Sequence, residues 1–324
     1  MTLPLDDDSV LVHVATAAGV PRHRFLNLDW QRISRGLYAR SLPDRPLIET
    51  AAMVAKVLPR RSGFGSLTSA ELRGWWLPNQ LSERRPLLAT TTSEVHVQRN
   101  GLYVRRSTVA DLEEIDRVPV VSGAQTLAEL ARDLSLVDLV PMVDCALRLG
   151  VDAESVLAAA RPRMRGCRRL RQAVNLADER SESWWESVLR LMHVLTGLGP
   201  VACQAELWRS GVFVARADLH LVGTNRYPEY DGGAHRERHQ HDADLGRDKR
   251  MSRAVHERYG YTGREIIHHP QMVIRDGEDA RGWLHDPERV RTWLSLAGPS
   301  SLTSYGRTRL SARLRRYELA ARRR

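Results

Sequence analysis

The chain has 324 residues, of which 42% are hydrophobic, so it is long enough for two or three domains with cores of their own. Its three cysteines lie in no CxxC or Cys/His spacing, which argues against a disulfide framework and against a structural zinc site. An acidic start and the lack of a run of about 18 apolar residues argue against export and membrane insertion, so we expect a cytoplasmic protein.

The formal net charge of +10 favours a polyanionic partner, because each phosphate that is neutralised releases condensed counterions. Almost all of the positive charge is arginine, and Lys56 and Lys249 are the only lysines. A GC-rich coding sequence would produce the same bias. We expect nucleic acid as the partner, DNA before RNA.

Residues 1–60 form a small basic segment that we expect to be winged-helix-like. In the stretch WQRISRGLYAR (30–40), arginines flank Gly36, which indicates a turn between two short strands. The apolar spacing from Leu47 to Val57 predicts a helix.

An α/β region is expected over residues 61–169. The stretch 87–108 is rich in β-branched residues and contains Asn100-Gly101, so it predicts two strands joined by a type I′ hairpin turn. Residues 118–150 predict a strand, a turn and two amphipathic helices, the second ending at the C-cap residue Gly150.

A domain boundary is expected near residue 170, where arginines crowd the sequence, and a second domain over 170–300. Residues 181–195 predict a helix that either Ser181 or Ser183 caps. The remaining elements are expected, in chain order, as a hairpin in 211–233, an arginine-rich helix over 235–260, a short strand at 263–269, a helix at 288–296 and a basic C-terminal helix within 301–324. That last helix is either solvated and docked on the body or an arm that grips phosphates.

The expected hairpin places two carboxylates side by side. If Gly223-Thr224 forms a two-residue loop, counting outward sets Asp218 opposite Glu229, with their Cβ atoms about 5 Å apart. The alternation of side chains then assigns one face to the core, namely Phe213, Ala215, Ala217, Leu219 and Leu221. Asp218 lies on the other face, with Arg216 and His220.

Facing carboxylates repel each other unless a cation neutralises them, so a divalent metal is expected at this pair. Oxygen ligands favour Mg²⁺, Mn²⁺ or Ca²⁺ over Zn²⁺. Asp231-Gly232-Gly233 follows directly, and glycines let a ligand approach the backbone closely. The alternative is an exposed sheet face on which the acids pair with Arg216 and Arg226.

A zinc site is a second alternative, because His235 and His239 stand one helical turn apart. No acid or cysteine stands at a firm third ligand position, however, and solvated or phosphate-contacting histidines are the preferred interpretation.

Four short motifs occur in order along the second half of the chain. They are SxxE at Ser183–Glu186, RADL around Asp218, EYDGxxH from Glu229 to His235, and DxxRD from Asp244 to Asp248. In this order and spacing they resemble the Vsr-like endonuclease domains of unknown function, which belong to the PD-(D/E)XK nuclease superfamily. The resemblance covers about residues 170–270.

This resemblance implies a restriction-endonuclease-like α-β-β-β-α core. Asp218 and Glu229 would bind Mg²⁺ or Mn²⁺, and Glu186 would approach from the preceding helix. Asp231 and His235 would complete the catalytic set, with the histidine carrying a proton. Three residues of the following helix are expected to contact nucleic acid: Arg247, Lys249 and Arg250.

Two features depart from the superfamily pattern. The lysine expected two residues after the glutamate is absent, because Asp231 stands there, so Lys249 or Arg247 would have to supply the positive charge. Pro228 precedes Glu229 and cannot donate to a sheet ladder, so the strand could be distorted at this point.

The first half of the chain resembles the AbiEi-type antitoxin and regulator region, through ISRGLYA and VPVVSGAQTLAELAR. The expectation is therefore an α+β protein with a metal-dependent DNA endonuclease domain that acts in defence or DNA repair, alone or with a toxin or defence partner. The alternative is an antitoxin or DNA-binding regulator with a degenerate nuclease fold. RNA cleavage is a third possibility.

Overall fold

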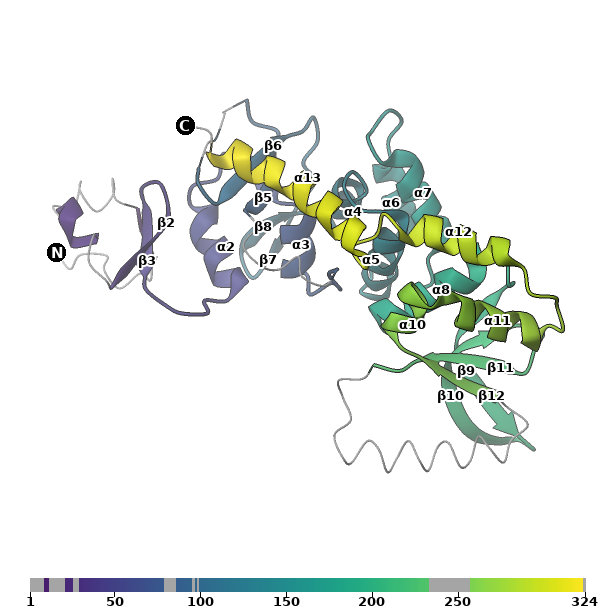
Figure 1. The fold of residues 1–324 in the computed structure, drawn as a ribbon. Helices are drawn as coiled ribbons and strands as arrows, with labels where there is room; N and C mark the ends of the chain where they lie inside the picture. The colour runs from purple at the N-terminus through teal and green to yellow at the C-terminus, as the bar shows by residue number, and fades with distance from the viewer. Residues whose placement is uncertain are drawn as a thin grey trace. The chain divides into compact units, whose positions relative to one another are not determined.

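The computed structural model describes residues 9–11, 21–25, 29–78, 86–94, 97, 99–232 and 257–322. The chain is α+β and divides into two compact units (Figure 1). Unit 1 comprises Met1–Asp133 and Leu310–Arg324, and unit 2 comprises Leu134–Arg309. Among the described helices, none combines the length and the apolar character that crossing a membrane requires.

Unit 1 is built from two sheets and their covering helices. A small antiparallel sheet has the order β1-β3-β2, and a mixed five-stranded sheet has the order β6-β5-β4-β8-β7. The elements are β1 (Ser9–Leu11), η1 (Arg22–Phe25), β2 (Trp30–Ser34), β3 (Leu37–Arg40), α2 (Leu47–Ala55), β4 (Ser62–Phe64), α3 (Ser66–Leu72), β5 (Leu87–Thr91), β6 (Leu102–Arg106), β7 (Leu112–Ile115), β8 (Val118–Val121) and α4 (Gly123–Leu130). The expected strands around Gly36 and the helix after them are confirmed as β2, β3 and α2.

The hairpin expected over 87–108 is wrong, because β5 and β6 run parallel, with Leu87 beside Leu102. The Asn100-Gly101 turn does form, and Gly101 has a φ of 77°. It closes on Arg99, which bridges to Leu102, and β5 has already ended at that point. The turn signal was therefore correct locally but did not identify the strand that pairs with β6.

The C-terminal helix α13 (Ser304–Arg322) belongs to unit 1 from Leu310 onward and is held there through Tyr317. The Tyr317 ring lies 4.7 Å from that of Tyr103, and its hydroxyl donates to Asp133 at 2.5 Å and accepts from Arg105 at 3.0 Å. Burial raises the pKa of Tyr317 to about 12. The side chain of Tyr317 therefore holds this basic helix against the rest of unit 1.

Unit 2 packs helices on one side of four strands (Figure 1). Strands β9 and β10 pair antiparallel, whereas β11 and β12 pair parallel. Helix α8 contacts β9, β10 and β11, and α10 and α11 follow the last strand. The elements are α5 (Leu136–Arg148), α6 (Ala153–Ala159), α7 (Cys167–Leu176), α8 (Trp184–Leu195), β9 (Val201–Arg209), β10 (Val212–Leu221), β11 (Arg226–Tyr230), β12 (Glu257–Tyr261), α10 (Gly263–His268), α11 (Pro270–Ala280) and α12 (Pro287–Ala297).

The division between the units follows residue 133, whereas the sequence suggested a boundary near residue 170. Helix α5 packs against both α7 and α8, so it shares a core with the helices that follow it. The second amphipathic helix of the expected 118–150 stretch therefore belongs to unit 2, although the strand and the first helix belong to unit 1.

Two expectations for the residues after 232 need correction. The stretch 263–269 is mainly the helix α10 and not a strand, because Thr262 and Glu265 form a reciprocal capping box that starts a helix. The arginine-rich helix expected over 235–260 ends too late, since Glu257–Tyr261 is strand β12. Its earlier residues lie outside the described part of the chain.

The core face expected for β10 is confirmed at four of its five residues, which are at most 4% exposed: Ala215, Ala217, Leu219 and Leu221. Phe213 was also assigned to the core, but 50% of its surface is exposed. A bulge shifts the register between Phe213 and Ala215, and this breaks the alternation on which the assignment depended.

Candidate functional site

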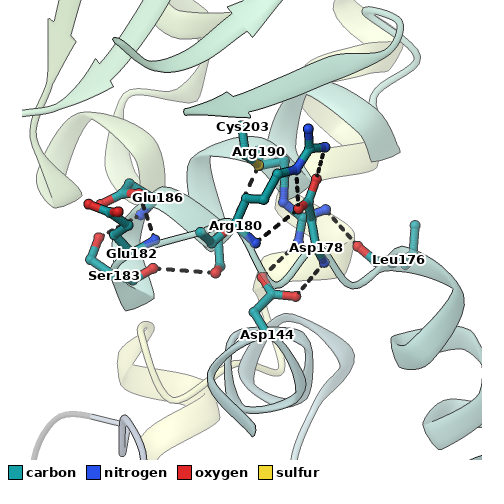
Figure 2. A network of polar contacts seen from close by, with 11 residues as sticks. Asp144, Leu176, Asp178, Arg180, Glu182, Ser183, Glu186, Arg190 and Cys203 are labelled. Atoms are coloured by element: carbon teal, nitrogen blue, oxygen red, sulfur yellow. Dashed lines mark hydrogen bonds and ion pairs between the residues drawn. The ribbon is translucent and has the colours of Figure 1, made fainter. Parts of the chain in front are cut away.

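The first turn of α8 fixes the side chain of Glu186. Ser183 is the N-cap residue, and its hydroxyl accepts a hydrogen bond from the Glu186 backbone N–H at 3.2 Å. The Glu186 carboxylate turns back and accepts from the backbone N–H of Glu182 at 2.9 Å (Figure 2). Because only 8% of Glu186 is exposed, the carboxylate is held in a nearly buried position at the helix start.

Gln204 of β9 supplies a second donor to this carboxylate, at 2.9 Å from its Nε2. Its backbone φ is +52°, which is uncommon for a residue other than glycine. In the β9–β10 register, Gln204 stands opposite Asp218 of β10. The strained strand position therefore brings the side chain that orients Glu186 next to the second acid of the site.

The charge of Asp218 acts on the carboxyl group of Glu186. Burial raises the pKa of Glu186, and the negative charge of Asp218 raises it further. The structure thus brings together two of the acids that the sequence singled out. They come from a helix and a strand that are 32 residues apart in the chain.

Asp218 is tied to the neighbouring strand β11, as its carboxylate accepts a hydrogen bond from the backbone N–H of Tyr230 at 3.0 Å. The rings of His220 and Tyr227 stack at 4.5 Å, which is the pairing that the expected Asp218–Glu229 register implies. The connection is longer than expected, because β10 ends at Leu221 and β11 begins at Arg226. Among the described residues, β10 forms its ladder with β9 and β11 forms its ladder with β12. The expected hairpin ladder between β10 and β11, with Gly223-Thr224 as a two-residue loop, is therefore not observed, although the two strands contact each other.

Glu229 is 2% exposed and forms an ion pair with Arg258 of β12. Strand β12 runs parallel to β11 and places Gly260 beside Glu229. The expected interaction of Glu229 was with a metal shared with Asp218, whereas the described contact is with an arginine. Sequence reasoning missed Arg258 because it fell within the expected helix over 235–260.

Two residues near Glu229 in the chain, Pro228 and Asp231, were also singled out in the sequence. Pro228 does not break the strand, since it pairs with Tyr259 within a continuous register. Asp231 is exposed, and its backbone N–H donates to the Tyr261 carbonyl at 2.8 Å, so the backbone pairing extends one residue beyond β11. Four of the expected site residues lie outside the described residues and stay predictions: His235, Arg247, Lys249 and Arg250.

A buried ion pair anchors α8 one turn after Glu186 (Figure 2). Arg190 donates to Asp144 of α5 at 2.7 Å and to the carbonyl of Leu176 at 2.6 Å, and Asp144 also accepts from the backbone N–H of Asp178 at 2.8 Å. Burial raises the pKa of Asp144, although Arg190 opposes this effect. Since Arg190 and Glu186 are four residues apart, this anchor also fixes the position of Glu186.

Within the described residues, no group of three His, Cys, Asp or Glu side chains is arranged to hold a metal ion. Mg²⁺ needs less than that, because it is commonly bound by one or two carboxylates together with water and substrate phosphates. Glu186 and Asp218 are two carboxylates whose charges interact, and the amide of Gln204 contacts Glu186. These oxygen donors fit Mg²⁺ or Mn²⁺ better than Zn²⁺.

Comparison of the chain with protein-family models, with curated proteins and with solved structures finds no match. The family suggested by the four motifs therefore stays a prediction.

Proposed function

We propose that unit 2 is a metal-dependent endonuclease domain that hydrolyses DNA phosphodiester bonds on a restriction-endonuclease-like core. The order of its elements supports this, since α8 precedes an antiparallel pair, β9 and β10, and a parallel pair, β11 and β12. The observation that carries the proposal is the position of Asp218, which is hydrogen-bonded to β11 and electrostatically coupled to Glu186.

Asp218 and Glu186 are the proposed ligands of Mg²⁺ or Mn²⁺. The Tyr230 backbone N–H orients Asp218, while the Glu182 N–H and the Gln204 amide orient Glu186. This differs from the ligand pair expected from sequence, because Glu229 is engaged by Arg258. Glu229 would join the ligands only if Arg258 moved away from it.

When bound, the metal would polarise the scissile phosphate and lower the pKa of a coordinated water. The chain's own residues would set the charge around that phosphate. Arg258 offsets the negative charge of Glu229, so a phosphate approaching β11 meets less repulsion than two free carboxylates would cause. Proton transfer by His235 remains part of the proposal.

The Glu229–Arg258 ion pair also favours a second candidate function. If the arginine keeps Glu229 permanently engaged, the site is degenerate and the chain is a DNA-binding regulator of the AbiEi antitoxin type, acting with a toxin or defence partner. The net charge of +10 suits either candidate, since both bind nucleic acid.

Calorimetric titration of Mn²⁺ into the protein separates the two candidates. The nuclease proposal predicts binding by the wild type and loss of that binding in both Asp218→Asn and Glu186→Gln. Glu206→Gln, which alters an exposed carboxylate of β9, is the control and should leave Mn²⁺ binding unchanged. Duplex DNA binding by a wild-type protein that takes up no Mn²⁺ would favour the regulator.

A further inference from the structure

The turn between β9 and β10 exposes an unusual concentration of apolar surface. Ser210 and Gly211 form the turn, with φ values of 49° and 78°, as in a type I′ hairpin. Beside them, Val212 is 66% exposed, Trp208 is 54% exposed and Phe213 is 50% exposed. We call these three side chains the hairpin tip. A tight two-residue turn holds them in a defined arrangement.

The two aromatic rings of the hairpin tip support each other. Trp208 and Phe213 are register partners, and their ring centroids are 5.6 Å apart with an interplanar angle of 75°. The indole N–H of Trp208 donates to Glu206 at 3.1 Å, so its hydrogen-bonding capacity is satisfied within β9. The part of the indole left for a partner is its apolar carbon surface.

The bulge before Ala215 explains why Phe213 is exposed. It shifts the register between Phe213 and Ala215, so Phe213 does not join the buried face of β10. A regular strand would have placed this ring on the same face as Ala215. The local geometry thus turns a core residue into part of an exposed surface, and exposed apolar patches mark sites of interaction.

We propose that the hairpin tip stacks against the nucleobases of the bound nucleic acid. This rests on the proposed function of unit 2. Aromatic faces are general platforms for bases, and apolar wedges also insert between base-pair steps. The chain's net charge of +10 attracts the phosphates, while the exposed apolar side chains of the hairpin tip suit the faces of the bases.

The size of the patch argues against a second copy of the chain as its partner. An aromatic side chain can bury about 150–250 Å², so two half-exposed rings offer on the order of 200 Å². A stable protein dimer buries about 800 Å² on each partner. The hairpin tip is therefore too small for a dimer interface but large enough to cover one or two bases.

The position of the tip on β10 predicts where it would act. Phe213 precedes Asp218 by five residues on the same strand, which corresponds to about 17 Å at roughly 3.3 Å per residue. Base pairs rise by about 3.4 Å per step. A base that stacks on the tip would thus lie within about five steps of the phosphodiester held at Asp218.

The test compares the double variant Trp208→Ala/Phe213→Ala with Met272→Ala/Leu284→Ala, which removes two exposed apolar side chains elsewhere in unit 2. Affinity for single-stranded and duplex oligonucleotides is measured by fluorescence anisotropy without metal, over a series of salt concentrations. Stacking predicts at least tenfold weaker binding by the tip variant, with an unchanged dependence of affinity on salt because no phosphate contact is lost. The control should bind like the wild type, and Trp208→Phe, which keeps a smaller ring, should bind more tightly than the double variant.

Equal affinity of the wild type and the tip variant would overturn this inference and leave the proposed function standing. A wild type that sediments as a dimer, with a monomeric tip variant, would also overturn it. Failure of the wild type to bind any oligonucleotide would overturn both proposals together. Thermal unfolding followed by circular dichroism confirms that each variant is folded before its binding is compared.

Discussion

The carboxylate of Asp218 accepts a hydrogen bond from the backbone N–H of Tyr230 at 3.0 Å. A side chain of β10 is thereby fixed by the backbone of β11, while the ring of Tyr230 stacks on Trp185 of α8 at 5.4 Å. One residue of β11 therefore connects the strand acid to the helix that carries Glu186.

Glu186 should make the stability of unit 2 depend on pH. Burial raises its pKa in the folded state above the ordinary value of a glutamate, so the folded state keeps this proton to higher pH than the unfolded state does. The stabilising effect is complete below about pH 4.5 and is lost as the pH rises through the raised pKa. Glu186→Gln cannot lose a proton, so its free energy of unfolding should increase relative to the wild type over this range.

Urea unfolding of both proteins between pH 4 and pH 8 measures this difference. When the same comparison is made in an Asp218→Asn background, the stability difference should appear at lower pH. The reason is that one cause of the raised pKa of Glu186, the charge of Asp218, has been removed. Parallel stability curves for Glu186→Gln and the wild type would show that Glu186 has no raised pKa.

Arg190 should contribute far more to stability than Arg180, although both form an ion pair with an aspartate in the same network (Figure 2). The Arg190 side chain is 5% exposed and its partner Asp144 is fully buried, whereas the Arg180 side chain is 59% exposed. Arg190→Leu leaves a buried charge without its partner, which costs about 3–5 kcal/mol. Arg180→Leu should cost less than about 1 kcal/mol. Chemical denaturation measures both, and equal losses would contradict the assigned anchor.

Glu229 and Arg258 should be energetically coupled. Because Glu229 is nearly buried, replacing Arg258 alone by leucine should destabilise the protein more than replacing it in a Glu229→Gln background. The expected coupling free energy is about 1–3 kcal/mol, obtained from urea unfolding of the two single variants and the double variant. Additive effects would mean that the ion pair does not hold β12 to β11.

Tyr317 should ionise late in a spectrophotometric titration. Burial raises its pKa to about 12, and its hydroxyl donates to Asp133. The Tyr317→Phe variant should lose an absorbance step near pH 12, and α13 should become more sensitive to proteolysis. Tyr305→Phe removes a tyrosine that is 61% exposed and serves as the control, in which the late step should remain. Because the pKa values of Tyr227, Tyr230 and Tyr261 are raised as well, a smaller late step should remain in Tyr317→Phe. A step near pH 12 of unchanged size in this variant would contradict the docked position of the helix.

Local signals in the sequence predicted those elements that depend on local physics. Ser183, one of the two expected caps, is the capping residue of α8, and the expected helix is observed over Trp184–Leu195. The alternation along β10 identified its core residues from Ala215 to Leu221. The same kind of signal was overlooked at residues 263–269, where a short strand was expected although Thr262 and Glu265 cap a helix.

Pairing between distant segments could not be predicted in the same way. Nothing near Leu102 indicates that β6 runs parallel to β5, and nothing near Glu229 indicates that Arg258 will lie beside it. Gln204 was missed because its role depends on a positive φ within β9, and a glutamine in the sequence does not predict that conformation. Asp218 was singled out by counting across the expected hairpin, and Glu186 was linked to it only through the resemblance to a nuclease family.

Cleavage of supercoiled plasmid in the presence of Mg²⁺ is the most direct test of the central claim. The account predicts that the wild type nicks or linearises the plasmid, that EDTA abolishes this activity, and that Asp218→Asn lowers it at least a hundredfold while remaining as stable as the wild type. Glu206→Gln should cleave like the wild type. Intact plasmid with the wild type across Mg²⁺ and Mn²⁺, or equal cleavage by Asp218→Asn, would contradict the assignment of a nuclease site to Asp218 and Glu186.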